Sequence, residues 1–274
     1  MMEKGIKYEV ENLGYDYIVF DQESDETKQI ATFKELIRRN VDAIIVSPIN
    51  PDLLVPLVDQ AHKNGIPVIV NDIGGGNSDY DAIVVSDNWQ GGQLAADYLA
   101  ARLKNSGGSK EVAIIACEPT AVYASIRGDS FQHYIEASGY EVVSDLRAYS
   151  RQEDGYARMK EILATHPDIE AVFAENDPMA VGAASALAEM NRKDIILVGF
   201  NGDQIAIDAI SNGLMEATVM QNPTEMGRIT AQLADRILQG KQLDYSNEEK
   251  REIYVNVSIM TKEELNKTTE RSDY

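Results

Sequence analysis

Short apolar runs alternate with longer stretches of helical periodicity along most of the chain. In the stretches between the runs, apolar residues recur at helical spacing, as at Met2, Ile6, Val10 and Leu13 before Gly14. Runs that are apolar at every position, rich in Val and Ile, are typical of strands buried on both faces of a parallel sheet. These predicted strands are residues 17–20, 43–46, 68–70, 83–85, 112–116, 171–174 and 195–198. The alternation predicts an α/β fold in which right-handed crossovers cover parallel sheets with helices.

The expected helix boundaries carry their own signals. Asn-Pro or Asp-Pro pairs at 50–51, 177–178 and 222–223 predict helix starts, because proline loses nothing in the first turn. Glycines that accept a left-handed backbone predict helix ends at Gly14, Gly65, Gly213 and Gly240.

Polar side chains follow the predicted strands, at the sheet edge where open α/β sheets bind ligands. Helix capping accounts for several of them, namely Asn50, Asp87, Asp177, Asp203 and Asn222. Capping does not account for four others, which are Asp72, Asn176, Asn201 and Gln221. A half-buried polar group without a partner costs about 1–3 kcal/mol, so a ligand, water or loop backbone is expected to satisfy each one.

Three amides and one carboxylate supply hydrogen-bond donors and acceptors but no nucleophile and no matched acid and base. This inventory suits binding of a neutral polyhydroxyl compound. Sugar sites commonly add an aromatic face, for which the candidates near strand ends are Trp89, Tyr123 and Tyr149. Packing against neighbouring residues is the alternative role for each aromatic side chain.

Composition excludes several classes of protein. The 274 residues suggest two lobes or one large domain. Asp and Glu number 45 against 25 Lys and Arg, and the net charge of −20 disfavours nucleic acid and anionic membrane surfaces as partners. The single cysteine, Cys117, and three scattered histidines predict no metal site. Dinucleotide, P-loop and nucleophile-elbow motifs are missing, so we expect neither a cofactor nor an enzyme.

Four segments resemble the type I periplasmic sugar-binding proteins, the ribose- and galactose-binding relatives. These segments are residues 86–88, 171–180, 197–202 and 217–223, in family order within a similarity that runs from 2 to about 260. The resemblance implies two doubly wound parallel-sheet lobes joined by three hinge crossings. We expect residues 1–86 plus 222–252 in the N-terminal lobe and 87–221 plus 253–274 in the C-terminal lobe.

The resemblance also implies a function. A small neutral sugar or polyol would bind in the interlobe cleft, and the closed protein, a monomer, would deliver it to the membrane subunits of an ABC permease. The protein would lie in a periplasm or be held outside the cell by a lipid anchor. The alternatives are the effector-sensing domain of a LacI-type regulator, a sugar-sensing receptor, or an enzyme acting on sugars.

Site roles follow from the resemblance residue by residue. Asp72 looks like the first-lobe carboxylate, Asn176 like the second-lobe amide, and Gln221 like the hinge glutamine. Asn201 stands where many relatives have aspartate, and Asn88 falls in the hinge-side Ser-Asp-Asn motif.

Several positions depart from the family pattern. Ile73 and Ser125 stand where relatives often carry arginine, and Arg127 matches a neighbouring position. We therefore expect a more neutral pocket and no assignment to ribose.

The start of the chain departs furthest from the pattern. Residues 2–13 resemble the family's first helix, which normally follows a first strand, a loop and a secretion signal. In the doubly wound order, that strand would lie beside residues 17–20, and its loss would expose two interior edges. We therefore expect an N-terminally incomplete form of an exported binding protein.

Overall fold

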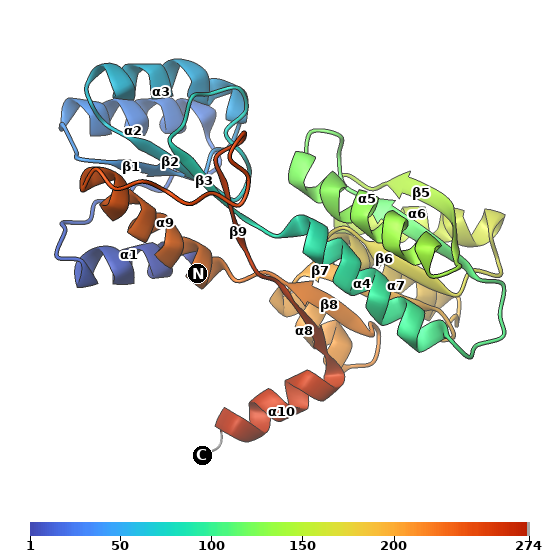
Figure 1. The fold of residues 1–274 in the computed structure, drawn as a ribbon. Coiled ribbons are helices and arrows are strands. Elements are labelled where there is room, and N and C mark those ends of the chain that lie inside the picture. Colours follow the sequence, from blue (N-terminus) through green and yellow to red (C-terminus); the bar gives the residue numbers. More distant parts are fainter. Residues whose placement is uncertain (273–274) are drawn as a thin grey trace. The chain divides into compact units, whose positions relative to one another are not determined.

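The chain divides into two units in a computed structural model that describes residues 1–272, with side chains as far as residue 267 (Figure 1). Unit 1 comprises Met1–Ser86 and Asn222–Val255, and unit 2 comprises Asp87–Gln221 and the chain from Asn256 onward. The chain therefore passes between the units three times, as the resemblance predicts.

Unit 1 is built on a four-stranded sheet whose neighbouring strands all run parallel, in the order β1-β2-β3-β9. The strands are β1 (Ile44–Val46), β2 (Val68–Asn71), β3 (Ala82–Ser86) and β9 (Glu252–Val255). Helices α2 (Glu26–Arg38) and α3 (Leu54–Lys63) lie on one face, the latter preceded by the 3₁₀ turn η1 (Pro51–Leu53) (Figure 1). Helices α1 (Met2–Asn12) and α9 (Pro223–Leu238) pack together on the other face.

Unit 2 contains a six-stranded sheet in the order β10-β8-β7-β6-β4-β5. Its strands are β4 (Glu111–Ala116), β5 (Glu141–Arg147), β6 (Ala171–Ala174), β7 (Ile196–Asn201), β8 (Ala217–Met220) and β10 (Ser258–Thr261). Only the pairing of β10 with β8 is antiparallel. The unit is therefore a parallel sheet with one antiparallel edge strand.

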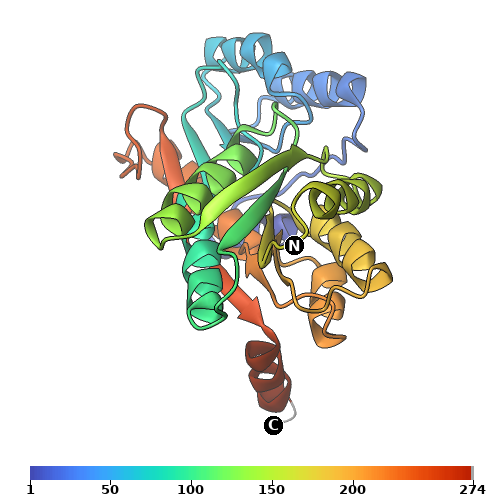
Figure 2. The ribbon, with the colours of Figure 1, turned by 90° about the vertical axis from the view of Figure 1, so that its right-hand side faces the viewer.

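Helices cover both faces of the unit 2 sheet (Figure 2). One face packs against α4 (Asn88–Leu103) and α5 (Val122–Ala137) in a core that includes Leu99 and Phe131. The opposite face packs against α6 (Gln152–Thr165), α7 (Asp177–Glu189) and α8 (Gln204–Ser211), and α10 (Lys262–Ser272) follows β10. The predicted doubly wound α/β class is confirmed.

The predicted helix ends hold, whereas one predicted strand does not. Gly14, Gly65, Gly213 and Gly240 follow helices with φ between +66° and +81°, which confirms the predicted helix ends. The strand predicted at 17–20 is wrong, because this segment has no regular secondary structure. An extended segment becomes a strand only when a neighbour pairs with it, and within residues 1–272 no strand does so.

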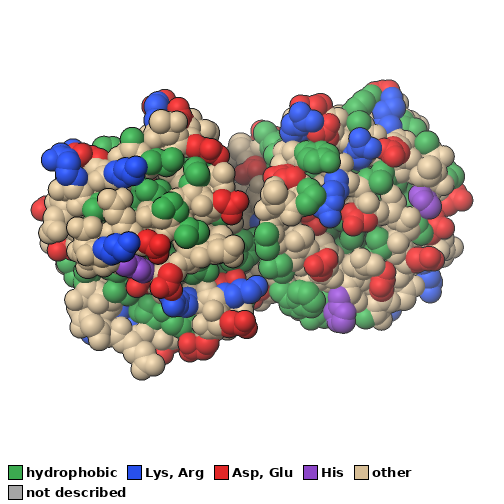
Figure 3. All heavy atoms as spheres, turned by 90° about the horizontal axis from the view of Figure 1, so that it is seen from above, with side chains coloured by type: hydrophobic (Ala, Val, Ile, Leu, Met, Phe, Trp, Pro, Cys, Tyr) green, Lys and Arg blue, Asp and Glu red, His purple; other side chains and the backbone are tan. Residues whose placement is uncertain are grey.

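The surface carries charges of both signs. On the face shown in Figure 3, Asp and Glu side chains are interspersed with Lys and Arg. Within residues 1–272, no helix combines the length and the apolar character that crossing a bilayer requires.

Candidate functional site

Polar residues gather at the carboxyl edge of the unit 2 sheet. Strands β4, β6 and β8 are followed by Cys117, Glu175 and Gln221, and β7 ends at Asn201. The backbone N–H of Gln221 donates to the carbonyl oxygen of Asn201 at 3.1 Å, which places these two predicted ligand residues on adjacent strand ends. The edge is therefore polar although the strands leading to it are apolar.

Arg127 organises this edge. Its guanidinium is buried, with Cζ 3.7 Å from the centroid of the Phe200 ring. Nε donates to Oδ1 of Asn88 at 2.7 Å, and Nη1 donates to the carbonyl oxygen of Glu175 at 2.8 Å and to Oδ1 of Asn201 at 3.5 Å. One planar cation thus ties the start of α4 to the ends of β6 and β7, with the donor geometry that makes arginine suited to such sites.

Arg127 and Phe200 were absent from the predicted site. The signal for Arg127 is its position on α5, where it shares a helix face with Ala124, Gly128 and Phe131, all buried. A cation on an otherwise apolar helix face predicts a buried polar network. A buried cation stands at the centre of this edge. The expectation of a more neutral pocket, which rests on Ile73 and Ser125, stays a prediction.

Two buried carboxyl groups lie behind the edge. Burial raises the pKa of Glu175 to about 7, against the opposing effect of the Cys117 N–H, which donates to Oε2 at 2.7 Å. Burial also raises the pKa of Asp177 to about 6, although Thr218 Oγ1 and the Asp203 N–H each donate to it at 2.7 Å. Both carboxyl groups accept hydrogen bonds from other groups of the protein, so we assign them a structural role next to the site.

Asn176 has a different local role from the one predicted. It is the N-cap of α7, because its Oδ1 accepts from the Met179 N–H at 3.1 Å, whereas Asp177 lies inside the first turn. Its Nδ2 donates to Cys117 Sγ at 3.4 Å. The assignment of the cap to Asp177 was wrong because an Asn-Asp-Pro sequence allows capping from either of the first two positions.

Asn201 and Asp72 both have a positive backbone φ. Asn201 has φ +130° and Asp72 has φ +70°, a region that non-glycine residues seldom occupy. Such conformations concentrate at functional sites, where the surrounding structure holds them. Asn201 Nδ2 donates to Asp203 Oδ2 at 3.1 Å, and Asn201 is partly buried whereas Asp203 is exposed.

Asp72 belongs to unit 1, where it directly follows β2. Its backbone N–H donates to the carbonyl oxygen of Val84 at 2.9 Å, and the next residue, Ile73, is 51% exposed. The carboxylate is therefore presented at the carboxyl edge of the unit 1 sheet.

The three candidate aromatic residues occupy different surroundings. The Trp89 ring packs against His133 and Tyr134 of α5, with centroids 6.0 and 6.3 Å away. Tyr123 lies in the first turn of α5, and Tyr149 is exposed in the turn after β5. The latter two follow the carboxyl ends of β4 and β5, whereas the Trp89 contacts favour the packing role. Within the described residues, no cluster of His, Cys, Asp and Glu is suited to hold a metal ion.

Comparison with known proteins shows the family of the chain. The family model of the periplasmic binding protein domain matches residues 1–242. The chain belongs to this family. This member of the periplasmic binding protein family is 34% identical over 242 residues to the ribose import binding protein of Bacillus subtilis (strain 168), covering 88% of this chain and 78% of the relative.

Further relatives of this periplasmic binding protein name apiose, ribose or myo-inositol. The D-apiose import binding protein of Actinobacillus succinogenes is 30% identical over 241 residues, which cover 85% of this chain and 76% of the relative. A periplasmic ribose ABC transporter structure from Conexibacter woesei has a TM-score of 0.88 at 28% identity, covering 98% of this chain and 89% of that one. A Bacillus halodurans solute-binding protein with bound myo-inositol has a TM-score of 0.80 at 28% identity, covering 98% and 92%.

Proposed function

We propose that the chain binds a small neutral sugar or polyol and delivers it to the membrane subunits of an ABC importer. The arrangement around Arg127 carries this proposal, because one buried guanidinium orients the side-chain oxygens of Asn88 and Asn201 at the edge where α/β sheets bind ligands. The names of the relatives, which include ribose, apiose and myo-inositol binding proteins, support the ligand class.

The residues suit binding rather than catalysis. In this proposal, Asp72 of unit 1 and Asn201, Asn176 and Gln221 of unit 2 contact sugar hydroxyls, with Tyr123 or Tyr149 against the ring. Each sugar hydroxyl is both a donor and an acceptor, and amides together with a carboxylate supply both partners. Asn176 contributes least, since its Oδ1 is occupied by its capping bond. We propose a monomeric, exported protein on the same family grounds.

Titration calorimetry against ribose, allose, arabinose, apiose and myo-inositol tests the proposal. We expect one of these compounds to bind with 1:1 stoichiometry. Asp72→Ala and Asn201→Ala should each weaken its affinity by about 10- to 100-fold, because each leaves hydroxyls without a partner.

Matched exposed variants separate a ligand contact from a general loss of structure. Asp59→Ala on α3 and Asn212→Ala after α8 remove the same groups from exposed positions in the two units, and both should bind like the native protein. Unchanged affinity in both Asp72→Ala and Asn201→Ala, or no binding by any of the five compounds, would refute the proposal.

A further inference from the structure

Asp177 is a buried carboxyl group whose hydrogen bonds lie outside its own helix. It is the first residue of α7 and is 0% exposed, yet the N-cap of that helix is Asn176, which accepts from the Met179 N–H. Burying a carboxylate costs free energy unless the fold supplies hydrogen-bond donors. A residue that is neither the cap nor exposed to solvent is therefore expected to act on the groups that donate to it.

The donors come from the end of β7 and from β8. The Asp203 N–H donates to Oδ2 of Asp177 at 2.7 Å, and the Gly202 N–H also donates to this carboxyl group. Thr218 of β8, which is 0% exposed, donates through Oγ1 to Oδ1 at 2.7 Å. The carboxyl group thus joins α7 to β8 and to the turn that follows β7.

Gly199 of β7 leaves the space that this carboxyl group occupies. A Cβ on Gly199 would lie 2.4 Å from Oδ1 of Asp177 and 3.1 Å from Cβ of Ala180. The first distance is far shorter than a van der Waals contact, so a larger residue would displace the carboxyl group. The sequence therefore supplies both the donors and the volume that Asp177 needs.

The turn held by Asp177 has an uncommon backbone conformation. Asn201 has φ +130° and Gly202 has φ +80°, and the former is unfavourable for a residue with a side chain. The Gln221 N–H donates to the carbonyl oxygen of Asn201 at 3.1 Å, which fixes the start of the turn. The two N–H groups that donate to Asp177 fix its end. We expect the turn to lose this conformation when the second anchor is removed.

This conformation of the turn orients the Asn201 amide. Its Nδ2 donates to Oδ2 of Asp203 at 3.1 Å, and its Oδ1 accepts from Nη1 of Arg127 at 3.5 Å. Both contacts depend on the position of the turn, because the turn carries both Asn201 and Asp203. A primary amide has a second N–H and a second oxygen lone pair, with which it can bind one hydroxyl group.

We propose that Asp177 is a positioning residue of the sugar site, which holds the turn 201–203 so that the Asn201 amide is oriented toward a sugar hydroxyl. Asp177 acts through the turn, because its own side chain is fully buried and both of its oxygens accept hydrogen bonds from the protein. The inference rests on the proposed function, since it needs a sugar at Asn201. The role requires an acceptor at the position of Oδ2 rather than a charge, because an amide oxygen accepts the same N–H group.

Asp177→Ala and Asp177→Asn test this role by calorimetry with the five compounds named above. Ala removes the acceptor, so affinity should fall by about 10-fold or more. Asn keeps an oxygen for the Asp203 N–H and can donate to Thr218 Oγ1, so affinity should stay within about 3-fold of the native value. Leu187→Ala is the control for lost stability. It removes buried packing about 15 Å further along α7 and should also stay within about 3-fold.

Hydrogen exchange of the sugar-free protein measures the turn without a ligand. The Asp203 amide should exchange about 10-fold faster or more in Asp177→Ala, and at the native rate in Asp177→Asn and Leu187→Ala. Unchanged exchange or unchanged affinity in Asp177→Ala overturns the positioning role, and so does an equal affinity loss in Leu187→Ala. Each of these results leaves the proposed function standing when the native protein binds a sugar. Absence of binding by the native protein refutes the proposed function, and the positioning role with it.

A second pair of variants tests the same hydrogen bond without changing a buried residue. Asp203 is exposed, and its φ of −68° already suits proline. Asp203→Pro removes the N–H that donates to Asp177, whereas Asp203→Ala removes only the side chain. The proline variant should therefore bind the sugar about 10-fold or more weakly than the alanine variant. Equal affinities in this pair overturn the role, and the comparison remains decisive where Asp177→Ala does not fold.

Discussion

Glu175 is a buried side chain at the unit 2 edge whose charge state depends on its surroundings. It is 3% exposed, and burial raises its pKa to about 7 from a usual value of 4.5. The N–H of Cys117 and the guanidinium of Arg127 oppose this shift without cancelling it. Folding therefore favours the neutral carboxyl. Its contribution to stability is fully present below pH 4.5 and is lost as the pH rises through about 7.

Glu175→Gln should remove this pH dependence, because an amide keeps the acceptor for Cys117 without ionising. Relative to the variant, the native protein should lose up to about 3 kcal/mol of unfolding free energy between pH 4.5 and 7.5. Urea unfolding at half-unit pH steps measures the difference. The pKa of Asp177 is raised to about 6 for the same reason, but this carboxyl group is present in both proteins and cancels.

Glu141→Gln, at an exposed position of β5, provides the comparison. It should leave the pH profile unchanged. Parallel profiles for the native protein and Glu175→Gln would show that Glu175 ionises in the fold as readily as in the unfolded chain.

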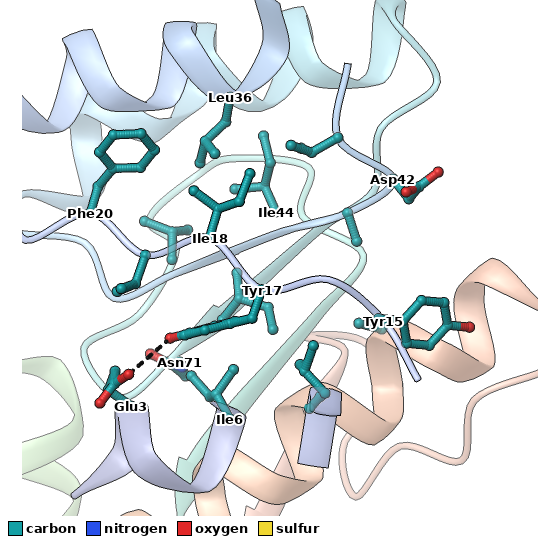
Figure 4. Close-up of a pocket in the computed structure, with 18 of the residues that line it drawn as sticks. Glu3, Ile6, Tyr15, Tyr17, Ile18, Phe20, Leu36, Asp42, Ile44 and Asn71 are labelled. Carbon is teal, nitrogen blue, oxygen red and sulfur yellow. Dashed lines mark hydrogen bonds between the residues drawn. The ribbon is translucent and has the colours of Figure 1, made fainter. Parts of the chain in front are cut away.

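At the level of elements, apolar runs predicted the central strands, because a strand that is buried on both faces must consist almost entirely of apolar residues. The strand predicted at 17–20 was wrong, because this apolar segment lines a groove instead of pairing with a neighbouring strand (Figure 4). The sequence pattern did not predict β5, because an edge strand needs fewer apolar residues and Ser144 and Asp145 interrupt the apolar run. Sequence therefore reports the burial tendency of a segment, whereas pairing depends on which neighbours are present.

The candidate site could be predicted only in part for a similar reason. Asn201 ends β7 and Gln221 follows β8, and their position in the sequence is sufficient to bring them to one edge. Arg127 reaches the same edge from the middle of α5, so its role depends on how that helix lies against α4 and β7. The sequence indicates such tertiary contacts only indirectly, here through a cation on an otherwise apolar helix face.

The contact between α4 and α5 therefore positions Arg127. A Cβ on Gly92 would lie 2.2 Å from the carbonyl oxygen of Arg127 and 2.7 Å from Ser130 Cβ, so α5 must shift to accept it. Gly92→Ala should lower the unfolding free energy by about 1–3 kcal/mol, despite a gain of up to about 1 kcal/mol in helix propensity. It should also weaken sugar affinity through the displaced guanidinium. Urea unfolding followed by Trp89 fluorescence, together with calorimetry, measures both effects.

Asp97→Ala is the control on the same helix, since Asp97 is exposed. It should preserve both stability and affinity. A Gly92→Ala protein as stable as the native one would mean that the two helices separate at no cost.

At the scale of the whole molecule, each unit has a core of its own. The clusters around Phe131 and Met159 lie in unit 2, and the cluster around Met226 lies in unit 1. Unit 1 also contains a groove of about 630 Å³ between residues 15–20 and β1 (Figure 4). Side chains that face this groove lack packing partners on that side. Two cores with unequal packing should unfold in two steps, with unit 1 first.

The single tryptophan makes this order measurable. Trp89 packs against His133 and Tyr134 in unit 2, so its fluorescence reports that unit, whereas far-UV circular dichroism reports both. We expect circular dichroism to begin changing at a lower urea concentration than Trp89 fluorescence. Trp89→Phe combined with Tyr254→Trp moves the reporter to β9 of unit 1 and should bring the fluorescence change to the earlier step. Coincident transitions for every probe would show that the two units unfold as one cooperative body, because non-coincidence of probes is the criterion for an intermediate.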